Sequence, residues 1–240
     1  MNIDFYLETI IKENLYSTKK KLNFHMKTLF NNVELKNKNV LDIGGGSGFY
    51  SFYAACSGAK QVTCIEPEAE GSASGSIKKF NRLLKLLKCD NISIIPTTFQ
   101  NFNPNEELYD VILLNNSINH LDEYSCINLK KDLSSKNNYQ KIFSKLYSIG
   151  NSKSKIIITD CSRYNFFGLL NIKNPFCPTI EWEKHQTPET WAKLLVKEGF
   201  KNPVIKWTTH NSLGNLGKFI LGNKIAAYFL RSHFNLTVNK

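Results

Sequence analysis

The fold of this chain is decided at residues 39–49, which read NVLDIGGGSGF. The first five residues form a short apolar run around one acid, as expected of a buried strand. The glycines after them let the backbone turn sharply and let a ligand approach without a Cβ in the way. From Phe49 the sequence becomes apolar and helical, and the N-terminus of such a helix presents its N–H groups to a ligand. The stretch predicts a strand, a turn and a helix, with a binding site at the turn.

The spacing of the glycines separates the possible ligands. Gly44, Gly46 and Gly48 give the pattern G-x-G-x-G. The dinucleotide pattern G-x-G-x-x-G would need a small residue at position 49, which is Phe49. No Gly-Lys-Ser or Gly-Lys-Thr comes next, which excludes a P-loop. Asp42 precedes the glycines, and an acid there repels a pyrophosphate but can bind a cationic amino group.

A second acid lies at the end of the next expected strand. Glu66 closes the run at 61–66, and a carboxylate at that place can bind both hydroxyls of a ribose. The alternative is an exposed carboxylate at a strand end. Because the glycine turn precedes it at the right distance, the ribose role is favoured.

Strands and helices alternate through the rest of the chain. Apolar runs predict strands at 39–43, 61–66, 92–96, 110–114, 155–159, 204–209 and 229–238. Helical spacing predicts one or two amphipathic helices within 3–32, and further helices at 49–57, 77–88, 136–147 and 188–198. The last begins with a capping Thr187 and Pro188 and ends before Gly199. A Gly/Ser loop is expected at 70–76. Such alternation predicts a parallel, doubly wound α/β sheet.

The segment from Asp42 to Gly48, with Glu66 ending the next strand, resembles the cofactor site of class I S-adenosylmethionine-dependent methyltransferases. Residues 109–116 resemble that family's fourth strand and the residues just after it, and the resemblance extends over most of the chain. It implies a Rossmann-like doubly wound sheet of seven strands, mostly parallel with an antiparallel last strand, plus N-terminal helices. It also implies S-adenosyl-L-methionine as the cofactor and methyl transfer as the activity.

Matched by position, the resemblance implies which residues bind the cofactor. Asp42 would hold the amino group and Glu66 the ribose diol, with Pro67 beside the adenine. Thr98 and Phe99 stand where the family often has an acid and a small residue, so the usual acid near adenine N6 is missing. The full expected set is Asp42, Gly44, Gly45, Gly46, Gly48, Glu66, Pro67, Thr98, Phe99, Asn115 and Tyr16, the last as a residue that could close over the cofactor.

Two histidines are candidates for the catalytic base. His120 comes after the fourth strand, on the side of a parallel sheet where ligands bind, and His185 lies in a long polar loop after the fifth. Either could instead be structural. The residues that could line the same pocket after strand five are Asp160, Arg163 and Tyr164. His25, His210 and His233 have no such context and are interpreted as structural.

The acceptor is constrained by the residues directly after the fourth strand. Methyltransferases of nucleobase amines often carry Asn/Asp-Pro-Pro-Tyr/Phe there, whereas this chain has Asn-Asn-Ser-Ile at 115–118. A metal-dependent catechol enzyme would need acids after strands four and five, and only Asp160 fits, so no metal is expected. We therefore expect O-methylation of a small molecule or glycan by direct displacement with histidine assistance. The alternatives are an RNA or protein methyltransferase, and a cofactor-binding protein without catalysis.

Composition constrains the class of acceptor, the state of the cysteines and the location of the protein. The 240 residues carry a net charge of +11, from 31 Lys+Arg against 20 Asp+Glu, but the excess is dispersed lysine, which argues against nucleic acid as the acceptor. The six cysteines form no CxxC pair and are expected to be reduced and mostly buried. No signal peptide or membrane span is recognisable, so we expect a soluble, cytoplasmic protein. The oligomeric state is left open.

We expect a single methyltransferase domain over 1–240. Residues 1–35 would be a helical lid and 36–240 the catalytic core, with 161–186 and 211–228 as acceptor-side or lid segments. The apolar residues of 213–230, namely Leu216, Phe219, Ile220 and Tyr228, are expected to pack as core. A lid, an oligomer contact and a surface for a lipid-like acceptor are the alternatives.

Overall fold

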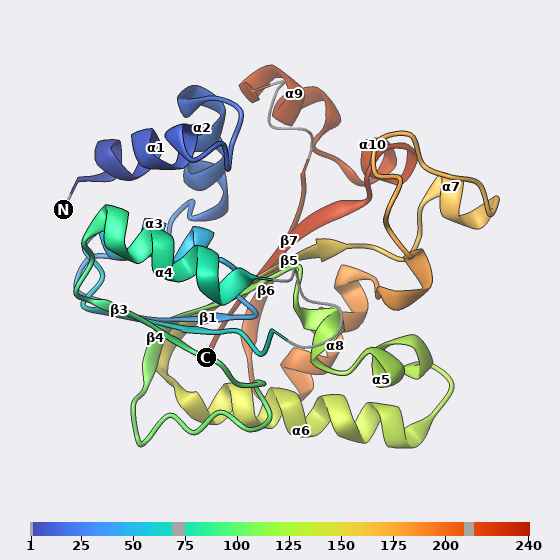
Figure 1. The fold of residues 1–240 in the computed structure, drawn as a ribbon. Coiled ribbons are helices and arrows are strands. Elements are labelled where there is room, and N and C mark those ends of the chain that lie inside the picture. The colour runs from blue at the N-terminus through green and yellow to red at the C-terminus, as the bar shows by residue number, and fades with distance from the viewer. Residues whose placement is uncertain (1, 69–74, 209–213) are drawn as a thin grey trace. The chain divides into compact units, whose positions relative to one another are not determined.

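A computed structural model describes residues 2–68, 75–208 and 214–240 (Figure 1). Seven strands are hydrogen-bonded in the order β3-β2-β1-β4-β5-β7-β6. β1 pairs in parallel with β2 and β4, β2 pairs in parallel with β3, and the last strand runs antiparallel to β6. The strands are β1 (Asn39–Ile43), β2 (Gln61–Ile65), β3 (Ile92–Ile95), β4 (Tyr109–Asn115), β5 (Gly150–Cys161), β6 (Lys201–Trp207) and β7 (His233–Asn239). The predicted Rossmann-like α/β fold is confirmed, including its antiparallel last strand.

Helices separate most of these strands. They are α1 (Ile3–Lys12), α2 (Lys19–Leu29), α3 (Phe49–Cys56), α4 (Ser76–Leu87), α5 (Glu123–Asn128), α6 (Leu133–Ile149), α7 (Phe166–Leu169), α8 (Pro188–Lys197), α9 (Gly214–Leu221) and α10 (Lys224–Phe229), with short 3-10 turns η1 (Ile118–Leu121) and η2 (Trp182–Lys184). The two amphipathic N-terminal helices are present as predicted, and α3 and α4 lie within a residue of their predicted bounds. His210 and most of the expected loop at 70–76 lie outside the described residues.

Contacts divide the chain into two compact units, and each is described by itself. The first comprises residues up to 115 together with 149–155. In it, α3 packs against β1 and β2, and α1 contacts α2, α3 and α4. The rings of Phe52 and Phe80 meet with centroids 4.8 Å apart, and the Tyr6 hydroxyl donates to the Phe49 carbonyl oxygen at 2.8 Å. These contacts anchor the helix that begins after the glycine turn.

The second unit comprises residues 116–148 and 156–240. Its helix α8 packs against β6 and β7 and begins as predicted, with the Thr187 hydroxyl accepting from the Thr190 N–H at 3.2 Å. Trp191, fully buried on α8, packs against Tyr139 and Phe143 of α6 at centroid distances of 4.9 and 5.9 Å. These aromatic contacts join α6 to α8.

Three strand boundaries were predicted wrongly. The strand expected at 229–238 begins only at His233, because Asn223 caps a helix over Lys224–Phe229 by accepting from the Ala226 N–H at 2.9 Å. A short apolar run fits a helix and a strand equally well, so periodicity alone misplaced it. β5 begins at 150 rather than 155, and β6 at 201 rather than 204, because polar residues continue both strands beyond their apolar parts.

The expectation that Leu216, Phe219 and Ile220 pack as core is wrong. Their exposed fractions are 70%, 87% and 56%. The physical reason is that α9 buries Gly217 and so turns its large side chains outward. Tyr228 on α10 is half-buried, and residue 213 lies outside the described chain.

All six cysteines are buried thiols, as predicted, and none forms a disulfide. Within 2–68, 75–208 and 214–240, no helix has the length and apolar character needed to cross a membrane. The same described residues contain no cluster of three histidine, cysteine or acidic side chains arranged to hold a metal ion.

Candidate functional site

The glycine turn after β1 uses its glycines for different reasons. Gly44, Gly46 and Gly48 have φ values of 67°, 56° and 78°, a left-handed conformation that other residues rarely adopt. A Cβ on Gly48 would collide with Cδ2 of Phe80, so this glycine is needed for packing of α3 against α4. A Cβ on Gly46 would meet nothing within 4 Å. The turn is therefore packed beneath Gly48 and open at Gly46.

Asp42 lies fully buried beneath this turn. Its Oδ2 accepts from the Ser51 hydroxyl at 2.6 Å, while its Oδ1 has no hydrogen-bond partner in the described part of the chain. Burial raises the pKa of Asp42 to about 6, the Ser51 hydrogen bond opposes this, and the nearby charge of Glu66 adds to it. A Cβ on Gly45 would approach Asp42 Oδ2 to 2.7 Å, so the carboxyl group reaches the turn only because residue 45 is glycine. An orphaned buried carboxylate oxygen is a natural partner for a cation.

Glu66 places a second carboxylate against the same turn. It is 4% exposed, its Oε2 accepts from the Gly46 N–H at 2.8 Å, and its Oε1 accepts from the Glu68 N–H at 3.1 Å. The turn is thus flanked by two acids contributed by β1 and by the residue after β2, as the sequence indicated.

An aromatic cluster adjoins the turn at the start of α3. The Tyr16 ring stacks on Phe49 and on His25, both with centroids 6.0 Å away. Nε2 of His25 lies 2.9 Å from the Tyr50 hydroxyl. Burial raises the pKa of Tyr50, and a hydrogen bond with the Asn115 side chain opposes this shift. Tyr16 and Asn115 were both expected at the cofactor site. Their contacts connect them through His25 and Tyr50, which were not expected there.

The remaining residues expected near the cofactor lie at or beside the neighbouring strand end. Pro67 is exposed and comes directly after Glu66, whose N–H donates to the Ile95 carbonyl oxygen of β3 at 3.1 Å. Thr98 lies just beyond β3 and caps a turn by accepting from the Asn101 N–H at 3.3 Å. Phe99 is 2% exposed and so belongs to the core.

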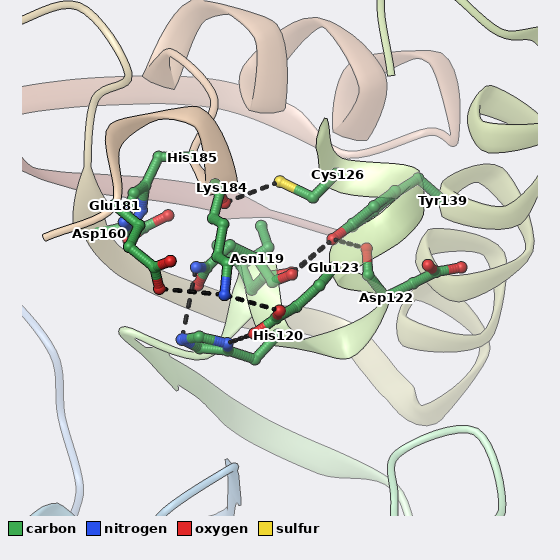
Figure 2. Close-up of polar contacts among 11 residues, drawn as sticks. Asn119, His120, Asp122, Glu123, Cys126, Tyr139, Asp160, Glu181, Lys184 and His185 are labelled. Carbon is green, nitrogen blue, oxygen red and sulfur yellow. Dashed lines mark hydrogen bonds and ion pairs between the residues drawn. The ribbon is translucent and has the colours of Figure 1, made fainter. Parts of the chain in front are cut away.

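The second unit brings His185 against a buried acid, as Figure 2 shows. His185 Nδ1 lies 2.9 Å from Asp160 Oδ1, which also accepts from the Cys161 N–H at 2.7 Å. Asp160 is 1% exposed, and its Oδ2 has no partner among the residues described. The side chain of His185 is 13% exposed. The acid at the end of β5 therefore holds the ring of the histidine by one nitrogen.

His120 has a different environment in the same unit (Figure 2). Its Nδ1 lies 2.6 Å from Glu123 Oε1, and its Nε2 lies 3.4 Å from Asn119 Nδ2. Its side chain is 45% exposed. The Lys184 ammonium bridges Glu123 and Glu181 at 3.3 and 3.0 Å. His120 thus belongs to a solvent-facing ionic cluster.

The loop that carries His185 is anchored to α5. Gln186 Nε2 donates to the Cys126 carbonyl oxygen at 2.6 Å, and the Cys126 thiol donates to the Lys184 carbonyl oxygen at 3.3 Å. Arg163, expected to line the same pocket, reaches the Glu183 carbonyl oxygen at 3.5 Å, and Tyr164 is 50% exposed. Asp160, Arg163 and Tyr164 were expected to line one pocket. Of these three, Asp160, near the end of β5, is the one hydrogen-bonded to a candidate histidine in the described structure.

Comparison with known proteins agrees with this geometry. A family model described as a methyltransferase domain matches residues 34–204. The chain belongs to this methyltransferase family. The identification of a class I S-adenosylmethionine-dependent methyltransferase is confirmed, and S-adenosylmethionine is its methyl donor.

Solved methyltransferases share the fold across nearly the whole chain. An S-adenosylmethionine-dependent methyltransferase from Aquifex aeolicus superposes with a TM-score of 0.62 at 14% identity, covering 95% of each chain. One from Archaeoglobus fulgidus has a TM-score of 0.57 at 15% identity, covering 97% of this chain and 99% of that one. The plantazolicin methyltransferase BpumL, solved with S-adenosylhomocysteine, has a TM-score of 0.53 at 18% identity, covering 92% and 81%.

A curated relative is similar over a shorter segment. Protein arginine N-methyltransferase 6 of Danio rerio is 28% identical over 114 residues. This segment is 47% of the present methyltransferase and 31% of that protein, so the match spans about a third of the relative's length.

The first unit of the methyltransferase fits its cofactor. S-adenosylmethionine carries a cationic amino group and a ribose diol, and the turn offers the orphaned Oδ1 of Asp42 and the carboxylate of Glu66. The empty space over Gly46 lets such a ligand approach the backbone.

Sequence reasoning expected neither Tyr50 nor His25 beside the glycine turn, and its interpretation of His25 as structural stays a prediction. Tyr50 stood directly after the glycine turn, at the start of the predicted helix, and this position was a usable signal. His25 gave no such signal, because it comes from α2 and reaches Tyr50 only through the tertiary packing of the first unit.

Proposed function

We propose that this methyltransferase transfers a methyl group to a hydroxyl of a small molecule or glycan, and that His185 takes the proton from that hydroxyl. The observation that carries the proposal is the hydrogen bond between His185 Nδ1 and the buried carboxylate of Asp160. When bound, the cofactor supplies a methyl group that is already activated on a sulfonium. The protein must then hold the cofactor, align the acceptor and accept the acceptor's proton.

The cofactor-binding residues are assigned within the first unit. Asp42 holds the amino group, Glu66 the ribose diol, and Gly44, Gly45, Gly46 and Gly48 form the backbone cradle, a set supported by the buried carboxylates and the open turn. Asn115 lies toward the methionine end. Pro67 and Thr98 are assigned to the adenine side, and Phe99, which is buried in the core, would act there only through its neighbours. Tyr16, in the expected lid at 1–35, covers the site, a role supported by its stacking on Phe49.

The geometry around His185 suits a general base. Asp160 is an acceptor when ionised, so the proton of the neutral imidazole is held on Nδ1 and the lone pair is left on Nε2. This tautomer is inferred from the contacts. After Nε2 takes a proton, the buried carboxylate stabilises the resulting imidazolium. Asp160 thus acts through His185, as a positioning residue.

His120 is less suited to the same role. Its Nδ1 is held by Glu123 and its Nε2 lies next to the Asn119 amide, so neither ring nitrogen is clearly available to a substrate hydroxyl. Its side chain is also 45% exposed, against 13% for His185. His185 is therefore the preferred base of the two candidates.

The test is transfer of an isotopically labelled methyl group from S-adenosylmethionine to fractionated metabolites and glycans, with labelled products identified by mass spectrometry. Once a product is found, His185→Gln should lower kcat by about 10²–10⁴-fold, the usual contribution of a general base. Asp160→Asn should lower kcat and move the pH profile, and both variants should bind S-adenosylhomocysteine like the wild type. His120→Gln is the matched control and should remain active. An unaltered kcat in His185→Gln would eliminate the proposed base.

Protein arginine methylation is a second candidate, favoured by the similarity to protein arginine N-methyltransferase 6. Arginine-rich peptides should be offered in the same labelling assay. Label on peptide guanidinium nitrogen, with none on hydroxyl compounds, would replace the O-methylation proposal.

A further inference from the structure

Large apolar side chains are exposed on three helices of the second unit. α10 packs against α7, with the rings of Phe166 and Phe229 at a centroid distance of 5.3 Å, and α9 precedes α10 by two residues (Figure 1). The Asn223 side chain ties the two by donating to the Ile220 carbonyl oxygen at 2.9 Å. We call this surface the apolar face, defined by Leu169, Leu170, Leu216, Phe219, Ile225 and Phe229, whose exposed fractions run from 49% to 87%. Side chains of this size are rarely left together in water without a partner.

The apolar face is held in place from beneath by buried polar side chains. Asn165, fully buried, donates through Nδ2 to the carbonyl oxygens of Tyr228 and Leu230 at 3.0 and 3.1 Å and to the Ser232 hydroxyl at 3.0 Å. Asn174, also buried, donates to the Leu230 carbonyl oxygen at 2.6 Å. Because these amides fix α7 to the end of α10, the exposure of the apolar face is a feature of the folded unit.

The charge of the surrounding sequence is of one sign. Over residues 214–231, which include α9 and α10, the charged residues are Lys218, Lys224 and Arg231, with no aspartate or glutamate. Residues 161–180 likewise contain Arg163 and Lys173 and no acid. An acid from outside these segments, Glu189 of α8, pairs with Lys224 at 2.6 Å, and both side chains are exposed. The apolar face is therefore accompanied by cationic side chains.

We propose that the apolar face binds the surface of an anionic lipid bilayer. Apolar side chains of such a surface enter the boundary between headgroups and acyl chains, and lysines beside them meet the anionic headgroups. A second copy of the chain is a poorer partner, because a symmetric contact would set the same acid-free, cationic segments against each other. The proposal does not depend on which acceptor is methylated.

The test is flotation of the full chain with vesicles of phosphatidylcholine alone and of phosphatidylcholine mixed in equal parts with phosphatidylglycerol. The wild type should bind the anionic vesicles more tightly than the neutral ones and should release at high salt. Lys218→Gln should weaken binding to the anionic vesicles about fivefold, as expected for one lysine near such a surface. Phe219→Ser should weaken it roughly tenfold or more, since one aromatic ring is lost from the bilayer.

The matched control is Leu133→Ser, which removes an apolar side chain of similar exposure, 70%, from α6 in the same unit. It should bind like the wild type, and because Phe219 and Leu133 are exposed, both variants should unfold at the wild-type temperature. The proposal is overturned if the wild type fails to float, or if both serine variants lose binding equally. It is also overturned if sedimentation reveals a dimer that Phe219→Ser dissociates, since a second copy would then cover the face.

Discussion

Replacing Asp42 with asparagine should stabilise the ligand-free protein and at the same time weaken its binding of the cofactor. Asparagine keeps an oxygen that can accept from the Ser51 hydroxyl, so the packing beneath the glycine turn is preserved. The substitution removes a charge that the fold buries without a full set of partners. The two effects have opposite signs, which separates them from a general loss of structure.

The magnitude is set by the pKa of Asp42, which burial raises from 3.8 to about 6. A raised pKa means that the folded state disfavours the charged carboxylate. The resulting loss of stability is absent below about pH 4, grows between about pH 4 and pH 6, and is complete above that. A shift of about two pKa units corresponds to about 3 kcal/mol, but the asparagine Nδ2 would replace the orphaned Oδ1 as a buried donor without a partner, at a cost of about 1–3 kcal/mol. Asp42→Asn should therefore gain up to about 2 kcal/mol near pH 7. Denaturant unfolding at pH 4 and pH 7 measures it.

Cofactor binding should show the opposite dependence on pH. If Asp42 holds the cationic amino group, binding favours the ionised carboxylate, of which about one tenth is present at pH 5. The affinity for S-adenosylhomocysteine should therefore be about tenfold lower at pH 5 than at pH 7.5 in the wild type, and nearly constant in Asp42→Asn. Calorimetry is the assay. His25→Gln alters the neighbouring aromatic cluster without removing a carboxylate and should leave the dependence intact. Equal, pH-independent affinity in the wild type and Asp42→Asn would refute the assigned role.

Three further predictions concern the same turn. Glu66→Gln keeps an acceptor for the Gly46 N–H but removes the charge toward the ribose, so calorimetry should find S-adenosylhomocysteine bound about tenfold more weakly, and an unchanged Kd would remove the ribose role. Gly48→Ala should destabilise the fold by about 2–4 kcal/mol, because its Cβ would meet Phe80 in a left-handed backbone conformation. Gly46→Ala should lose only about 1 kcal/mol of stability but most of the cofactor affinity, since its methyl would enter open space over the turn. If the two alanine variants lose stability equally, or Gly46→Ala binds normally, the cradle is wrongly placed.

The sequence was informative wherever a signal is local. The glycine turn with Asp42 and the Thr187 cap of α8 are each decided by a few consecutive residues, and both were located correctly. Glu66 could also be found, because it follows the glycine turn at the distance expected of an acid at the end of the next strand.

The features that the sequence did not predict depend on contacts between segments that are far apart in the chain. No local pattern joins His25 to Tyr50, and the hydrogen bond between His185 and Asp160 depends on how the loop after β5 folds back. The exposure of Phe219 was misjudged for the same reason, since an apolar helix indicates that something will cover it but does not identify the partner. The distinction between His120 and His185 likewise required the partners of each ring nitrogen.

The hydrogen bond from the Gly46 N–H to Glu66 has a kinetic consequence. It joins the turn to the residue after β2 before any ligand binds. The binding site is therefore already formed when the nucleoside arrives. Because little of the turn has to become ordered during binding, the association rate constant should approach that of a rigid receptor. Analogues altered at the ribose should consequently enter at similar rates and differ mainly in how quickly they leave.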